Sequence, residues 1–186
     1  MTDVRLEILG SGSAIPTKNR NQAAQILSLH NKSFMIDCGE ATQHQMIRHA
    51  VSTSRMNHIF ISHLHGDHCF GLLGLISTLG MRGRTADLYI HSHSALEPLL
   101  RPSLNFFCRD LSFEVKFEPY DHTSASVLYE DRGLVVSTFP LKHSLPSSGF
   151  LFKEKEKERH IISDKIRLDL IELQKYFNKN NITNAV

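Results

Sequence analysis

The side chains best able to do chemistry gather in one short stretch, ISHLHGDHCFG, at residues 61–71. Within it, His63, His65, Asp67 and His68 form the pattern H-x-H-x-D-H. Burying that many ionisable groups is costly unless each one finds a partner or a metal. Neutral imidazole and carboxylate suit zinc, and no set of thiolates accompanies them. The stretch therefore predicts a metal site.

The spacing divides these ligands into two groups. His63 and His65 are two positions apart, so in extended backbone they point to the same side. Asp67 and His68 follow where the chain turns into a helix and can address a second position. Two metals roughly 3.5–4 Å apart can generate hydroxide near neutral pH and hold both the attacking and the leaving oxygen. The pattern thus predicts a hydrolase and leaves phosphodiester, thioester and amide substrates open.

Two histidines leave the first metal short of a ligand. The best distant candidate is His143, in FPLKHSLPSSGF, although these residues alone fit a lone polar loop residue equally well. A second H-x-H pair, His91 and His93, has no D-H pair after it. We interpret these two as surface histidines.

Strand and helix patterns alternate along the chain, which is typical of a layered α/β domain. The expected strands are residues 4–9, 23–29, 33–37, 57–62, 88–91, 111–118, 134–139 and 149–152, with a hairpin turn at Asn31 and Lys32. The expected helices are residues 40–50, 69–79, 94–100 and 165–177, the third begun by a serine cap and closed near Pro102. The histidine stretch falls between a strand and a helix.

Composition indicates one folded domain without an extreme character. The chain has 186 residues, twelve of them histidine, and a formal net charge of +2, too small to indicate nucleic-acid binding by itself. No apolar run is long enough to cross a bilayer, and the N-terminus lacks the features of a signal peptide, so we expect the cytoplasm and no membrane partner. The three cysteines, Cys38, Cys69 and Cys108, have no C-x-x-C spacing and are expected to be reduced.

The metal motif resembles the signature of the metallo-β-lactamase superfamily, and the chain more narrowly resembles ribonuclease Z, the endonuclease that processes tRNA 3′ ends. The narrower resemblance rests on four stretches in order. They are ILGSGSAIPTKNRN at residues 8–21, FMIDCGEATQHQM at 34–46, IFISHLHGDHCFGLLGL at 59–75 and PLKHSLPSSGF at 140–150. One small departure is Ala41, which stands where the family usually has glycine.

The resemblance implies roles for individual residues. It makes His63, His65 and His143 ligands of one zinc ion, and Asp67 and His68 ligands of a second. It also makes Asp67 the general base toward the attacking water. Asp37 resembles a family carboxylate behind the metals that holds a ligand histidine in its correct tautomer, although an aspartate ending a strand can also simply cap the next segment of chain.

For the whole chain, the resemblance implies a metallo-β-lactamase-like αββα sandwich that acts on precursor tRNA, removes its 3′ trailer and is normally a homodimer. The match covers residues 1–152, the N-terminal part of that domain, and leaves 153–186 as a charged connector and a helix. The downstream aspartate that bridges both zinc ions and the last histidine ligand have no match, and Asp164 is a poor substitute. We therefore expect a domain truncated at its C-terminus. The alternatives are a weakly active or inactive fragment, or another hydrolase of the superfamily such as a thioesterase or lactonase.

Overall fold

The structure is a computed structural model that describes residues 4–156, 171–173, 175 and 179. The chain divides into two compact units, Met1–Lys155 and Glu156–Val186. In the second unit, residues 171–173, 175 and 179 are helical. They overlap the helix expected at 165–177. The rest of that expected helix, together with Asp164, lies outside the described residues.

A six-stranded sheet forms the centre of the first unit, and its spatial order follows the chain order from β1 to β6. The first three strands pair antiparallel and the last three continue the sheet in parallel. Their bounds are Arg5–Gly10 (β1), Ala24–Leu29 (β2), Lys32–Cys38 (β3), Met56–Phe60 (β4), Leu88–Ser92 (β5) and Val115–Pro119 (β6). Parallel neighbours end at the same edge of the sheet, which brings the residues after each strand together.

The hairpin between β2 and β3 turns one residue earlier than expected. His30 and Asn31 have φ angles of 50° and 64°, and Lys32 already pairs with Leu29. A two-residue hairpin turn of this kind needs positive φ at both central positions, which asparagine adopts more readily than most residues. The prediction that placed Asn31 and Lys32 in the turn was therefore wrong by one position.

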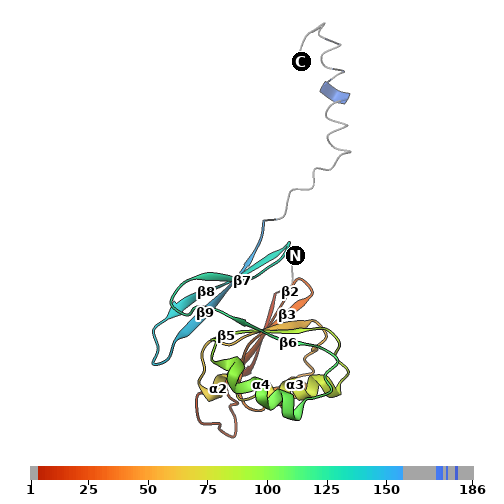
Figure 1. The fold of residues 1–186 in the computed structure, drawn as a ribbon. Coiled ribbons are helices and arrows are strands. Elements are labelled where there is room, and N and C mark those ends of the chain that lie inside the picture. Colours follow the sequence, from red (N-terminus) through yellow and green to blue (C-terminus); the bar gives the residue numbers. More distant parts are fainter. Residues whose placement is uncertain (1–3, 157–170, 174, 176–178, 180–186) are drawn as a thin grey trace. The chain divides into compact units, whose positions relative to one another are not determined.

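Helices cross over between the parallel strands and cover one face of the sheet (Figure 1). They bury an apolar core that includes Ile26, Met35 and Ile59 from the sheet. Their bounds are Thr42–Arg48 (α1), Gly66–Cys69 (α2), Leu72–Met81 (α3) and Leu96–Phe107 (α4). The helix expected at 69–79 thus becomes two helices, and the second half of the histidine motif lies within the first of them.

The helix α4 does not close near Pro102, as the sequence predicted, and it has no serine cap. It starts after Ala95, without a capping side chain, and contains Pro102 in its interior. The hydrogen bond that Pro102 cannot donate would have gone to the carbonyl of Pro98, in the first turn. Burial of Leu96 and Leu104 in the core holds the helix together on both sides of this gap.

A second, three-stranded antiparallel sheet packs on the other face of the central sheet, so the unit has a helix layer and two sheet layers (Figure 1). The contact buries Phe34 and Phe60 of the larger sheet against Leu134 and Val136 of the smaller one. The strands are Ser126–Glu130 (β7), Leu134–Leu141 (β8) and Ser147–Glu154 (β9). Strand β7 was not predicted, because none of its residues is fully buried and its sequence shows no clear alternation. These layers are the αββ part of the expected sandwich.

In the described part of the chain, no helix combines the length and the apolar character needed to span a membrane.

Candidate metal centre

The motif residues meet at the edge of the central sheet where the parallel strands β3 and β4 end. Asp37 is the next-to-last residue of β3. Strand β4 ends at Phe60 and leads into Ser62 and His63, and α2 then begins at Gly66. This edge is where open α/β sheets commonly place their ligands, because the loops leaving adjacent parallel strands emerge side by side.

Three imidazoles converge at this edge. Nε2 of His63 lies 3.0 Å from Nδ1 of His65, and Nε2 of His143 lies 3.3 Å from the same atom. His143 comes from the loop between β8 and β9, so both sheets contribute to the cluster. Nitrogen ligands about 2.0–2.1 Å from a tetrahedral zinc ion are about 3.3 Å apart. The three side chains therefore fit one metal ion with a fourth position left open.

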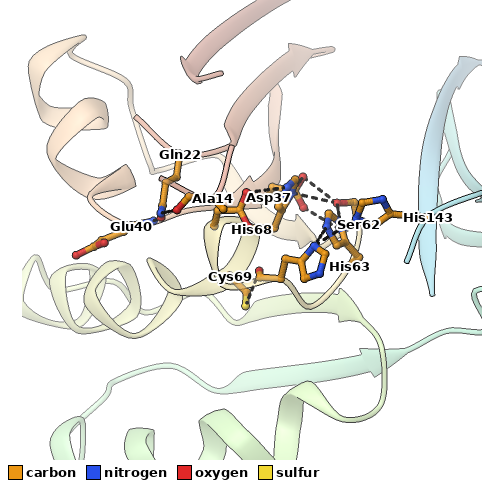
Figure 2. Close-up of polar contacts among 11 residues, drawn as sticks. Ala14, Gln22, Asp37, Glu40, Ser62, His63, His68, Cys69 and His143 are labelled. Atoms are coloured by element: carbon orange, nitrogen blue, oxygen red, sulfur yellow. Dashed lines mark hydrogen bonds and ion pairs between the residues drawn. The ribbon is translucent and has the colours of Figure 1, made fainter. Parts of the chain in front are cut away.

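The hydroxyl of Ser62 fixes the tautomer of the nearest imidazole (Figure 2). Its single hydrogen is donated to Oδ2 of Asp37 at 2.9 Å. The same oxygen must therefore accept a hydrogen bond from Nδ1 of His63, which lies 3.0 Å away. His63 consequently carries its proton on Nδ1 and presents the lone pair of Nε2 to the cluster, which is the form that a metal binds.

Asp67 and His68 lie beside this cluster, on α2. Nδ1 of His68 donates to Oδ2 of Asp37 at 2.7 Å, so in the neutral ring Nε2 carries the lone pair, and this atom lies 3.6 Å from Oδ2 of Asp67. Within the described residues, three or more metal-binding side chains in mutual reach occur only at His63, His65 and His143. Asp67 and His68 thus offer two ligands toward a second position.

Asp37 holds both groups of candidate ligands in place, through Ser62, which contacts His63, and through His68. Its carboxylate accepts the backbone N–H of Ser62 at 2.8 Å, the Ser62 hydroxyl at 2.9 Å and the His68 ring at 2.7 Å. The side chain is only 6% exposed, and the backbone is left-handed with φ of 57°. A non-glycine residue in this conformation is uncommon, although aspartate and asparagine tolerate it better than most. The contacts place the carboxylate directly behind His68, a candidate ligand.

Burial and neighbouring charges set the protonation of the site. Burial, with His68 nearby, lowers the pKa of His63 to about 4, so this imidazole is neutral at neutral pH. Burial alone would lower the pKa of His68, but the hydrogen bond to Asp37 and the charges of Asp37 and Asp67 raise it. Burial raises the pKa of Cys69 to about 11. Its thiol is therefore protonated, and Sγ donates to the carbonyl of His65 at 3.4 Å.

A cavity of about 490 Å³ opens over these residues. Besides the five motif and loop ligands, its lining includes Gly66, Phe70, Ser13, Ala14 and Gln22. Gln22 and Phe70 had no predicted role at this site. No local pattern marks these two residues.

Gln22 holds the loop between β1 and β2 over the cavity (Figure 2). Its side-chain nitrogen donates to the carbonyl of Ala14 at 3.1 Å, and its side-chain oxygen accepts the backbone N–H of Glu40 at 2.9 Å. Gln22 is itself buried. One amide therefore ties the loop to the segment that precedes α1.

The prediction that His91 and His93 are surface residues was wrong for His91. Its side chain is 4% exposed, and Nε2 lies 3.0 Å from Nδ1 of His58 on the neighbouring strand. The cause is the position of β5 inside the sheet, where helices and the second sheet cover the two faces and neither face of the strand meets solvent. His93 is partly exposed. Neither residue belongs to the metal cluster.

Nearly the whole length of the chain aligns with known proteins. Ribonuclease Z of Bacteroides fragilis is 54% identical over 166 residues, which are 89% of this chain and 55% of the relative. Ribonuclease Z of Phocaeicola vulgatus is 50% identical over 185 residues, 100% of this chain and 59% of the relative. The chain thus spans somewhat more than half the length of these curated relatives.

Solved structures agree with the fold. Human tRNase Z, short form (ELAC1), superposes with a TM-score of 0.72 at 29% identity and covers 82% of this chain and 66% of its own. The metallo-beta-lactamase fold protein YhfI of Bacillus subtilis superposes with a TM-score of 0.61 at 16% identity, over 80% of this chain and 56% of its own. The predicted α/β metallo-β-lactamase fold and the resemblance to part of ribonuclease Z are both confirmed.

A family model also matches nearly the whole chain. It is described as Anti-Pycsar protein Apyc1 and matches residues 4–184. That range includes the whole histidine cluster, Asp37 and the loop that covers the cavity. The chain therefore belongs to the family of the Anti-Pycsar protein Apyc1, and nearly all of it aligns with somewhat more than half the length of proteins named ribonuclease Z.

Proposed function

We propose that this chain is the zinc-binding part of a phosphodiester hydrolase that removes the 3′ trailer from precursor tRNA. One observation carries the proposal. Nε2 of His63, Nδ1 of His65 and Nε2 of His143 converge under a cavity in a chain similar to ribonuclease Z over more than half that protein's length. Three neutral nitrogen ligands with an open fourth position are typical of catalytic zinc.

The chain's own residues would divide the work. His63, His65 and His143 would hold one zinc ion, and His68 with Asp67 would address a second. Zinc supplies Lewis acidity that activates water and offsets the charge on phosphoryl oxygens. Asp67 lies in the cavity wall and is 9% exposed, so its carboxylate would accept a proton from water inside the cavity.

The charges on the loop over the cavity favour a negatively charged substrate. Ser13 and Ala14 line the cavity, and further along the same loop Lys18 and Arg20 are exposed. No hydrogen bond or ion pair engages the charged group of either side chain among the described residues. These two exposed cations of the loop would attract phosphates of a polynucleotide.

Cleavage of a precursor tRNA tests this proposal. The chain with zinc, and the same chain joined to the remaining segment of the B. fragilis relative, would be incubated with a 5′-labelled precursor carrying a 3′ trailer. We expect a product that ends in a 3′-hydroxyl beside the acceptor stem, formed about 100-fold more slowly or worse by Asp67→Asn. Asp110→Asn, an exposed carboxylate outside the site, serves as control. If neither the chain nor the joined form cleaves, the tRNA assignment fails.

A second candidate is a fragment that binds zinc but does not turn over by itself. It is favoured by the two ligands that Asp67 and His68 alone offer at the second position, and by the chain's 55% to 59% coverage of its relatives. The same experiment separates the two. Activity of the joined form alone identifies a fragment, and activity of the chain by itself refutes that interpretation.

We also propose a homodimer and a cytoplasmic location, on the basis of the resemblance to ribonuclease Z and of the proposed tRNA substrate. The residue divisions 1–152 and 153–186 remain our proposed domain limits. Light scattering after size-exclusion chromatography would measure the mass, and a monomer at all concentrations would refute the dimer.

A further inference from the structure

We propose that Phe70 is a stacking platform for a nucleobase beside the scissile phosphate. The inference rests on the proposed function and adds a base-binding element to it. Phe70 is 72% exposed although it is a large apolar side chain, and it lines the same cavity as the histidine cluster. A single exposed apolar residue is ordinary on a protein surface. Phe70 differs from such a residue because it lies in the cavity wall and because its ring packs closely against the backbone of Gly66.

The ring is held against the backbone by a glycine. A Cβ atom added at Gly66 would lie 2.2 Å from ring atoms Cε2 and Cζ of Phe70. Only a residue without a side chain lets the ring pack this closely against the start of α2. The backbone N–H of Phe70 also donates to the carbonyl of Gly66 at 2.9 Å. One side of the ring is therefore covered by main chain.

The backbone after the ring is equally fixed. The N–H of Gly71 donates to the carbonyl of Cys38 at 2.9 Å, and a Cβ at Gly71 would come within 2.0 Å of the carbonyl oxygen of Gly39. The chain after Phe70 is thus pressed onto the end of β3. An aromatic side chain whose backbone is anchored on both sides loses little conformational freedom when a ligand covers it.

The surroundings of the ring favour a base over an aliphatic group. Polar side chains of Ser13 and Gln22 line the same cavity, and the exposed cations Lys18 and Arg20 continue from it along the loop. Sites for single-stranded nucleic acid combine aromatic faces, on which bases stack, with cations that meet the phosphates, and the cavity wall and its loop supply both kinds of group. Stacking reads the flat face that every base has, so the platform would tolerate any base at this position.

Binding of a short RNA tests the platform independently of cleavage. The full chain would be titrated into a single-stranded oligoribonucleotide that carries 2-aminopurine, whose fluorescence falls on stacking. We expect Phe70→Leu to abolish this fall and to weaken binding about five-fold or more, whereas Phe70→Tyr keeps both. The matched control is Phe106→Leu, because Phe106 is also exposed, at 64%, and lies on α4 outside the cavity. Circular dichroism would check that each variant folds.

An abasic site at the 2-aminopurine position completes the test. The wild-type chain should lose as much affinity from the missing base as from Phe70→Leu, and the variant should lose nothing more. Equal binding by Phe70→Leu and Phe106→Leu, or no fluorescence change with the wild-type chain, would overturn the platform. If the wild-type chain and its joined form fail to cleave the trailer but 2-aminopurine fluorescence still falls on binding, the proposed function is refuted and the stacking role of Phe70 is not.

Discussion

Nδ1 of His68 lies 2.7 Å from Oδ2 of Asp37, a buried residue with left-handed backbone whose other hydrogen bonds all go to Ser62. This carboxylate therefore sets both the ring orientation and the tautomer of a candidate ligand. Partners of this kind typically change metal affinity by about 10- to 100-fold.

Asp37→Asn should therefore weaken zinc binding about 10- to 100-fold while leaving the fold intact. Asparagine keeps the shape of the side chain and tolerates positive φ, but it no longer attracts the His68 proton as a carboxylate does. Titration against a chromogenic chelator would measure the affinity, with Asp110→Asn as the control. Unchanged zinc affinity would show that the carboxylate of Asp37 matters only as the acceptor of the Ser62 backbone N–H.

Zinc should stabilise the chain through the three converging imidazoles. A ligand at 100 times its dissociation constant adds about 2.7 kcal/mol to the free energy of unfolding. Thermal denaturation with and without zinc should show this gain in the wild-type chain and lose most of it in His65→Ala or His143→Ala. His44→Ala is the control, because His44 is exposed on α1. An undiminished gain in His143→Ala would remove that residue from the ligand set.

Ala41→Gly should stabilise the protein. Ala41 precedes α1 with φ of 62° and ψ of 14°, a left-handed conformation that glycine adopts without the steric cost that a Cβ brings. We expect a gain of roughly 0.5–1 kcal/mol in the free energy of unfolding, measured by urea denaturation. Ala86→Gly is the matched control, because Ala86 has no positive φ and glycine there should destabilise. Loss of stability in both variants would contradict this account.

Acid should destabilise the fold through the buried pair His58 and His91. Burial lowers the pKa of His58 to about 4, helped by Lys32 and Arg84, and lowers the pKa of His91 to about 3, helped by His58. Their ordinary value is 6.5. Below pH 6.5 these two imidazoles bind protons in the unfolded chain but not in the folded chain. The free energy of unfolding is therefore highest above pH 6.5 and decreases as the pH falls toward 4. Each imidazole contributes up to about 1.4 kcal/mol per pH unit.

Urea denaturation between pH 7.5 and pH 4.5 would measure this slope. His91→Asn should make it shallower, since one buried imidazole no longer titrates while the side chain can still hydrogen-bond to His58. The rings of Tyr89 and Tyr129, which also face His58, remain in place. His44→Asn, at an exposed position, should keep the wild-type slope. An identical slope in His91→Asn would mean that the pair does not govern acid stability.

The sequence predicted the parts of the fold and site that depend on local patterns. Apolar runs located β4 and β5, and the H-x-H-x-D-H spacing identified the residues that the sheet edge brings together. His143 could be added only by resemblance, because its contact with His65 spans 78 positions and depends on how two sheets pack.

Tertiary packing explains what was missed. The strand at His91 was predicted but its burial was not, because the covering of both faces and the pairing of the ring with His58 across the sheet depend on tertiary packing. Pro102 is a helix breaker by local rules, and burial of Leu104 on its far side outweighs that preference. Phe70 lies within the 61–71 stretch, but no spacing there gives it a role, and only the cavity shows that it belongs to the site.

His63 and His65 follow a strand of the larger sheet, whereas His143 joins two strands of the smaller one. Apart from their shared apolar core, the sheets are tied near this point by the N–H of Ser148, which donates to the carbonyl of Ser62 at 3.0 Å. An ion held by all three imidazoles would cross-link the sheets, much as a disulfide joins distant segments. Loss of the ion would remove one of the ties between the sheets, so faster hydrogen exchange in β7, β8 and β9 would report on the occupancy of the site.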